Sequence, residues 1–132
     1  MSLRLHTSFI TAALFASLSV VATGQQNIPY RVHTKIGFAS QRLLNEHYRK
    51  HGREFGKVTK EEFLRMAQDL RDRPLDMKIL EAVRADRVVT RFDRRTKAFI
   101  AFERNLVIRT FFKPADGEKY FHRQLRSARR RR

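Results

Sequence analysis

The hydrophobic pattern of the chain begins, after its N-terminal segment, with a helical stripe. Between residues 40 and 51 the less polar side chains recur every three or four positions, which places them on one helix face: Leu43, Leu44, His47, Tyr48 and His51. Ser40 can cap this helix, which we expect to run to about Lys50. Gly52 is well placed to end it in a left-handed turn, and Gly56 allows a second such turn. The stripe therefore delivers the imidazole of His51 to the edge of the core.

A second helix is predicted over residues 59–70. Thr59 and Glu62 form a capping box at its start. Its apolar face, which we interpret as core, contains Phe63, Met66, Ala67 and Leu70.

After Pro74 the pattern changes to short β-rich runs separated by polar turns, at 77–83, 88–92, 98–102 and 107–112. Connections this short can join only antiparallel neighbours. The first run is also compatible with a helical turn, because it contains Leu80, Glu81 and Ala82. The sequence predicts an α+β domain in which two N-terminal helices pack on one face of a four-stranded antiparallel β-meander.

The ends of the chain differ from its middle. Residues 1–24 resemble a signal peptide, with Arg4, an apolar run over 9–21 and small residues at Ala22 and Gly24. An uncleaved amphipathic segment and a misassigned start codon are the alternatives. The apolar run is short for a membrane span, so we expect no stable membrane insertion once the signal is removed. We therefore predict an extended lead-in over 25–37, a domain over 38–125 and a disordered basic tail over 126–132, with secretion or a periplasmic location.

Composition narrows the class of protein. The chain has 132 residues, enough for one small domain, which we expect to be a monomer. Its formal charge of +16 points to a polyanionic partner such as nucleic acid, an acidic membrane surface or an acidic protein. It has no cysteine, which excludes disulfides and thiolate metal sites.

The candidate chemistry centres on His51. Cleavage of RNA by its own 2′-hydroxyl needs a proton carrier and cations around the phosphate. Histidine suits the first task, and Lys50 and Arg53 lie beside it in the sequence for the second. The alternative is a partly buried histidine that hydrogen-bonds the backbone.

Other polar residues are weaker candidates. Thr110 is the polar member of a strand face that reads Leu106, Ile108 and Phe112, and its hydroxyl could contact a phosphate. Arg109 and Lys113 lie on the opposite register of that strand as possible phosphate contacts. His122 and His33 are possible second proton carriers.

The sequence offers little for a metal or a cofactor. His47 and His51 have zinc-ligand spacing, but the cations around them argue against a dication. We expect no metal and no cofactor. The chain lacks a Gly-rich phosphate loop, a GxSxG elbow and a paired-carboxylate motif, so nothing favours a kinase, an esterase or a glycosidase.

Several short blocks occur in a characteristic order between about Phe38 and Gln124. They are His-Gly-Arg-Glu-Phe-Gly at 51–56, Thr-Lys-Glu-Glu-Phe-Leu at 59–64, Val-Thr-Arg-Phe-Asp-Arg-Arg-Thr-Lys-Ala-Phe at 89–99, Ile-Arg-Thr-Phe-Phe-Lys-Pro at 108–114 and Tyr-Phe at 120–121. In this order the chain resembles the colicin D-like nuclease domains of bacterial polymorphic toxins, including the contact-dependent inhibition type. These belong to a wider fold group with barnase, EndoU and RelE.

The resemblance implies a metal-independent endoribonuclease that cuts tRNA and leaves a 2′,3′-cyclic phosphate. By position, His51 matches the catalytic histidine, Lys50 a phosphate-binding lysine and Thr110 an assisting strand hydroxyl, while Lys113 is a further phosphate contact. The resemblance also implies an acidic immunity protein as partner and action in the cytoplasm of a target cell.

The chain departs from the family pattern at its hairpin turns, which read Ala85-Asp86-Arg87, Lys97 and Arg104-Asn105. Composition alone equally favours two other functions. One is a non-catalytic basic module that holds nucleic acid or anionic lipid, and the other is an interaction protein whose basic face binds an acidic partner.

Overall fold

The computed structural model describes residues 29–130, so the predicted signal segment and the last two arginines lie outside the described residues. Within this range no helix is long and apolar enough to cross a membrane. The elements are, in order, α1 (Gln41–His51), the 3-10 helix η1 (Gly52–Phe55), α2 (Lys60–Asp72), β1 (Ile79–Val83), β2 (Val89–Asp93), β3 (Phe99–Phe102), β4 (Ile108–Phe112) and α3 (Glu118–Arg130).

The four strands form one sheet in the order β1-β2-β3-β4, and each strand is antiparallel to the next. The predicted α+β class and the meander are therefore confirmed. Within the predicted run at 77–83, residues 79–83 form strand β1. They are not a helical turn, because each of them pairs with a residue of β2.

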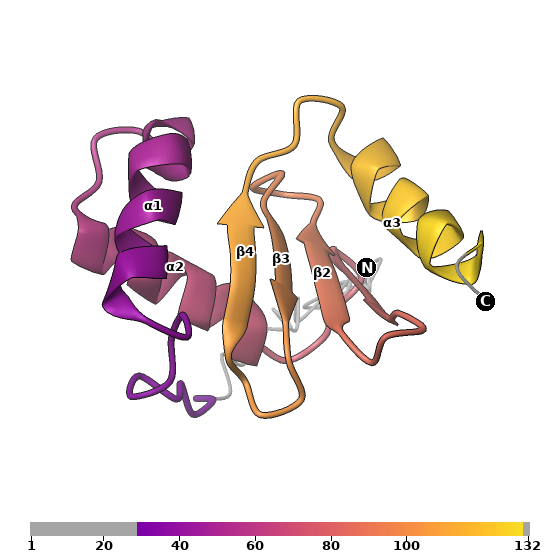
Figure 1. The fold of residues 1–132 in the computed structure, drawn as a ribbon, viewed down its shortest axis with the longest axis horizontal. Helices are drawn as coiled ribbons and strands as arrows, with labels where there is room; N and C mark the ends of the chain where they lie inside the picture. Colours follow the sequence, from indigo (N-terminus) through magenta and orange to yellow (C-terminus); the bar gives the residue numbers. More distant parts are fainter. Residues whose placement is uncertain (1–28, 131–132) are drawn as a thin grey trace, which may run out of the picture.

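Helices cover both faces of the sheet (Figure 1). Helices α1 and α2 pack on one face, where Phe63, Ile100 and Phe111 belong to a single buried cluster. Helix α3 packs on the other face, where Phe121 meets a second cluster that includes Phe99. Every residue of β3 is consequently buried.

The position of α3 corrects two predictions. The sequence predicts helices on one face of the sheet and none on the other, and it predicts a disordered tail over 126–132, of which the structure describes 126–130. The structure instead continues α3 to Arg130. The aromatic residues Tyr120 and Phe121, with Leu125 one turn later, give this basic segment an apolar side that packs on the sheet.

Helix α1 begins at Ser40, whose side chain accepts a hydrogen bond from the Leu43 N–H. Gly52 does not end it in a left-handed turn: its φ is −55°, and the chain continues directly into η1. A glycine is required there for another reason, because a Cβ atom would lie 2.6 Å from the ring of Tyr48. Gly56 does adopt the left-handed region, with φ 88°.

A bulge in β4 changes the predicted strand faces. Thr110 pairs with Ala101, but Ile108 pairs with Phe102, so Arg109 is the additional residue between these two pairs. Ile108 and Phe111 therefore both contribute to the cluster under α1 and α2. The prediction that Ile108 shares a face with Thr110 is wrong, because the alternation breaks at the bulge.

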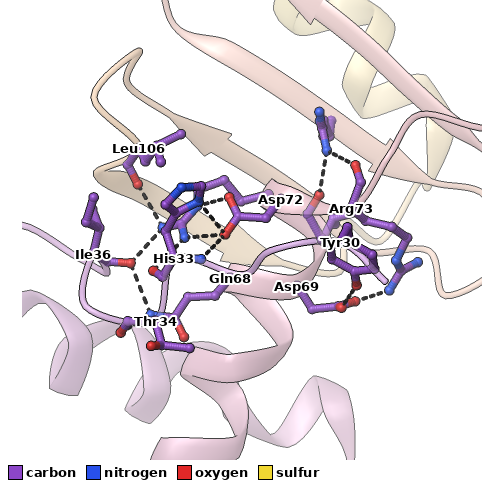
Figure 2. A network of polar contacts seen from close by, with 12 residues as sticks. Tyr30, His33, Thr34, Ile36, Gln68, Asp69, Asp72, Arg73 and Leu106 are labelled. Atoms are coloured by element: carbon purple, nitrogen blue, oxygen red, sulfur yellow. Dashed lines mark hydrogen bonds and ion pairs between the residues drawn. The ribbon is translucent and has the colours of Figure 1, made fainter. Parts of the chain in front are cut away.

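The segment predicted as a lead-in is tied to α2 by hydrogen bonds (Figure 2). The Tyr30 hydroxyl donates to Asp69, and Gln68 Nε2 donates to the carbonyls of Thr34 and Ile36 at 2.9 and 3.0 Å. The Ile108 N–H donates to the Gly37 carbonyl at 2.9 Å. The packed part of the chain thus includes residues 30–37, ahead of the predicted boundary at 38.

The buried guanidinium of Arg71 completes this connection. It donates to the carbonyls of Ile36 at 2.6 Å, His33 at 2.9 Å and Leu106 at 3.0 Å. It also forms a 2.7 Å ion pair with Asp72, whose side chain is 4% exposed. One side chain therefore joins the N-terminal segment, α2 and the β3–β4 turn.

Candidate active site

His51 is the last residue of α1, and this helix packs beside β4 (Figure 1). Its ring packs on Phe112, with ring centroids 5.0 Å apart. The side chain is 14% exposed, so the imidazole is mostly shielded but still reaches the surface. The helical stripe predicted this position at the edge of the core.

Glu54 holds the imidazole in place. One of its carboxylate oxygens, Oε1, lies 2.8 Å from His51 Nδ1. The other, Oε2, accepts a 2.6 Å hydrogen bond from the backbone N–H of Lys113. With Nδ1 engaged by the carboxylate, Nε2 is the ring nitrogen left for proton transfer.

Glu54 was missed among the sequence candidates, although a signal for it was present. A histidine and a glutamate three residues apart lie on the same side of a helical segment. Its second contact, to Lys113, joins positions 59 residues apart and depends on the fold.

Exposed cations flank the His51–Glu54 pair along the chain. Arg49 and Lys50 occupy the last turn of α1, Arg53 lies in η1, and Lys57 follows Gly56. Within residues 29–130 none of these four has a carboxylate within 4.0 Å. Their charge is therefore available to an anion, and the predicted phosphate contacts Lys50 and Arg53 are exposed, one and two positions from His51 along the chain.

Lys113, which directly follows β4, is a further cation near Glu54. Its backbone fixes Glu54, and its Nζ lies 5.1 Å from the centroid of the Phe55 ring. Phe55 in turn stacks on Phe111 with centroids 4.5 Å apart. The ammonium group is thus held over the ring of Phe55 in η1.

Arg109 and Thr110, which the sequence predicts as candidate site residues, have no hydrogen bond to His51 among the residues that the structure describes. Arg109 forms an ion pair with Glu103 at 2.5 Å, near the start of β4, roughly 13 Å along the strand from Lys113. Thr110 is half-buried on the α3 side of the sheet, like Phe112, and within the described chain its hydroxyl makes no hydrogen bond to His51. Among the described residues, neither side chain forms a hydrogen bond with the imidazole.

The other histidines within residues 29–130 have partners of their own. His47 Nδ1 lies 2.9 Å from the Leu43 carbonyl, and its ring centroid is 6.3 Å from that of His51. His33 contacts Asp72 and His122 contacts Glu118. No group of three His, Cys, Asp or Glu side chains in the part of the chain that the structure describes could hold a metal ion.

The arrangement combines a partly shielded imidazole, a carboxylate that orients it and exposed cations at neighbouring positions of the chain. Such a site can move a proton beside a bound phosphate. Comparison of the whole chain with protein-family models and with curated proteins finds no match.

Proposed function

We propose that this protein is a metal-independent endoribonuclease with His51 as its proton carrier. In the reaction the ribose 2′-oxygen attacks the adjacent phosphorus, the bond from phosphorus to the 5′-oxygen breaks, and a 2′,3′-cyclic phosphate forms. His51 Nε2 takes the proton of the 2′-hydroxyl, and the leaving 5′-oxygen takes a proton from water. Lys50, Arg53 and Lys113 offset the charge that develops on the phosphate oxygens.

The observation that carries the proposal is the double contact of Glu54. A carboxylate that binds both His51 Nδ1 and the Lys113 backbone fixes the ring relative to β4. A surface that bound RNA by charge alone would not need an oriented imidazole at its centre. The orientation favours catalysis over simple binding.

The substrate and the setting follow from the resemblance described above. We propose tRNA as the substrate, an acidic immunity protein as the partner that covers the basic site, and export followed by action in the cytoplasm of another cell. The charge of this segment supports the choice, because four exposed cations within six positions of one histidine suit a polyanion and an acidic protein equally well.

The cations also favour a second candidate, a non-catalytic basic module. Arg49, Lys50, Arg53 and Lys57 would hold nucleic acid or an acidic protein whatever His51 does. The two functions differ in the fate of the bound RNA, which remains intact in the second case.

The test is incubation of the purified full chain with total tRNA in EDTA, followed by a denaturing gel and analysis of the fragment ends. We expect discrete fragments that end in 2′,3′-cyclic phosphate. Intact tRNA in the presence of folded, RNA-binding protein would overturn the nuclease and favour the binding module. Fragments with 3′-hydroxyl ends would overturn the 2′-hydroxyl mechanism.

A further inference from the structure

A pocket borders η1, the short helix that follows His51. It is a pocket of about 360 Å³ between α2 and the end of the sheet. This volume falls at the lower end of small-ligand pockets, roughly 300–1,000 Å³. Its apolar wall includes Phe55, Met66, Leu70, Ala98 and Phe111.

The pocket and the His51 site share two residues. Phe55 belongs to η1, which directly follows His51, and its ring lines the pocket. Lys113 lines the pocket with its side chain, while its backbone N–H binds the carboxylate that orients His51. A ligand in the pocket therefore contacts one residue that follows His51 in the chain and one whose backbone holds its carboxylate partner, while His51 itself does not line the pocket.

The acidic groups of the pocket are already engaged within the protein. Asp93 contacts Arg73 at 3.2 Å and accepts a 2.8 Å hydrogen bond from the Arg95 N–H. Burial raises the pKa of the Asp93 carboxyl, but the hydrogen bonds from Arg95 and Thr96 outweigh it and hold the pKa below its usual range. Asp69 contacts Arg73 and Tyr30.

Two cations that line the pocket differ from its acidic groups in their surroundings. Arg65 and Lys113 both line the pocket, and neither has a carboxylate within 4.0 Å among the described residues. The pocket thus offers an apolar, partly aromatic interior together with two available positive charges.

We propose that this pocket binds one nucleobase of the RNA next to the cleaved bond, with the adjoining phosphate on Lys113 and Arg65. The inference rests on the proposed function and names the subsite that positions its substrate. A base has two apolar faces. One face of the Phe55 ring is stacked on Phe111, so the base takes the other face, and the Lys113 ammonium that lies over that face turns to the phosphate. Because the carboxylates have protein partners, stacking and shape hold the base rather than hydrogen bonds to its edge.

The test follows the backbone amide resonances of the full chain during titration with adenosine 3′-monophosphate and, separately, with inorganic phosphate. We expect saturable shifts at Thr96, Ala98 and Lys113 with the nucleotide, and no shifts at Thr96 and Ala98 with phosphate. Phe55→Leu removes the aromatic face while keeping an apolar side chain, and should weaken nucleotide binding about tenfold. Phe102→Leu is the matched control, because Phe102 lies at the other end of β3 and does not line the pocket.

The outcomes separate this inference from the nuclease itself. Equal shifts with phosphate and nucleotide, confined to the cations around His51, would overturn the base pocket. Cleavage of tRNA by Phe55→Leu at the rate and KM of the Phe102→Leu control would also overturn it, while leaving the nuclease intact. Nucleotide binding in the pocket without any cleavage of RNA would support the pocket and contradict the proposed nuclease.

Discussion

The backbone N–H of Lys113 donates a 2.6 Å hydrogen bond to Glu54, although the two residues are 59 positions apart. This contact joins the end of β4 to the short helix that follows His51. Since the other carboxylate oxygen of Glu54 binds His51 Nδ1 at 2.8 Å, the sheet determines how the imidazole is turned. The proposed mechanism depends on this connection.

Replacement of Glu54 by Gln should slow the chemical step. An amide lacks the charge that pairs with the imidazole ring, and the loss of a fixed orientation costs about 10²-fold in rate. We expect kcat to fall by about this factor with little change in KM for tRNA, measured in steady-state assays. Equal losses in kcat and in the fraction of folded protein would assign Glu54 a structural role instead. Glu46→Gln is the control, because Glu46 pairs with Arg42 on the exposed side of α1.

Arg53 and Arg109 should differ in their contribution to RNA binding. Arg53 is exposed beside His51, whereas Arg109 is paired with Glu103 near the other end of β4. If Arg53 contacts a phosphate, Arg53→Ala should reduce the slope of log K against log salt by about 1. Arg109→Ala should leave the slope unchanged. The same slope for both variants would contradict the assigned phosphate site.

Gly52→Ala should destabilise the fold and disturb the site together. The new methyl group would lie 2.6 Å from the ring of Tyr48, which is held by a hydrogen bond from its hydroxyl to the Val58 carbonyl. We expect a loss of about 1–3 kcal/mol in the free energy of unfolding, measured with urea. Gly37→Ala is the comparison, since its Cβ would come closest, at 3.0 Å, to the end of the flexible Leu64 side chain. It should remain within about 1 kcal/mol of the wild type.

The pairing of Asp72 with Arg71 predicts a dependence of stability on pH. Burial raises the pKa of the Asp72 carboxyl, but hydrogen bonds from Arg71 and the His33 N–H hold it below the ordinary value of 3.8. This contribution to stability is therefore present above about pH 4 and is lost as the pH falls through the folded-state pKa. Asp72→Asn should lower the free energy of unfolding by about 3 kcal/mol at pH 7, because it leaves Arg71 buried without its ion pair.

The check is urea unfolding of the wild type and of Asp72→Asn between pH 7 and pH 3. The gap between the two proteins should narrow as the solution becomes acidic. A gap that stays constant over this range would show that the carboxylate charge does not stabilise the fold.

The sequence predicts the parts of this protein that depend on local pattern. The spacing of Leu44, Tyr48 and His51 is enough to place the imidazole at the edge of the core. The capping box at Thr59 marks the start of α2, and both of its hydrogen bonds are present in the structure. The short β-rich runs after Pro74, joined by short turns, predict the antiparallel meander.

Features that depend on long-range contacts are not visible in the sequence. The bulge in β4 moves Thr110 away from the face of Ile108, and nothing in the local sequence marks it. Helix α3 was missed because its many cations conceal the apolar side formed by Phe121 and its neighbours. The bond between Glu54 and Lys113 requires η1 and the end of β4 to meet.

The central claim is that His51 carries the proton, and the most direct measurement is the rate of tRNA cleavage in EDTA by two histidine variants. His51→Ala should lose at least about 10²-fold in kcat while still binding tRNA, because general acid–base catalysis contributes roughly 10²–10⁴-fold. His122→Ala removes the same ring from α3, where it contacts Glu118, and should cleave at the wild-type rate. Cleavage by His51→Ala at the rate of the His122 variant would contradict the account.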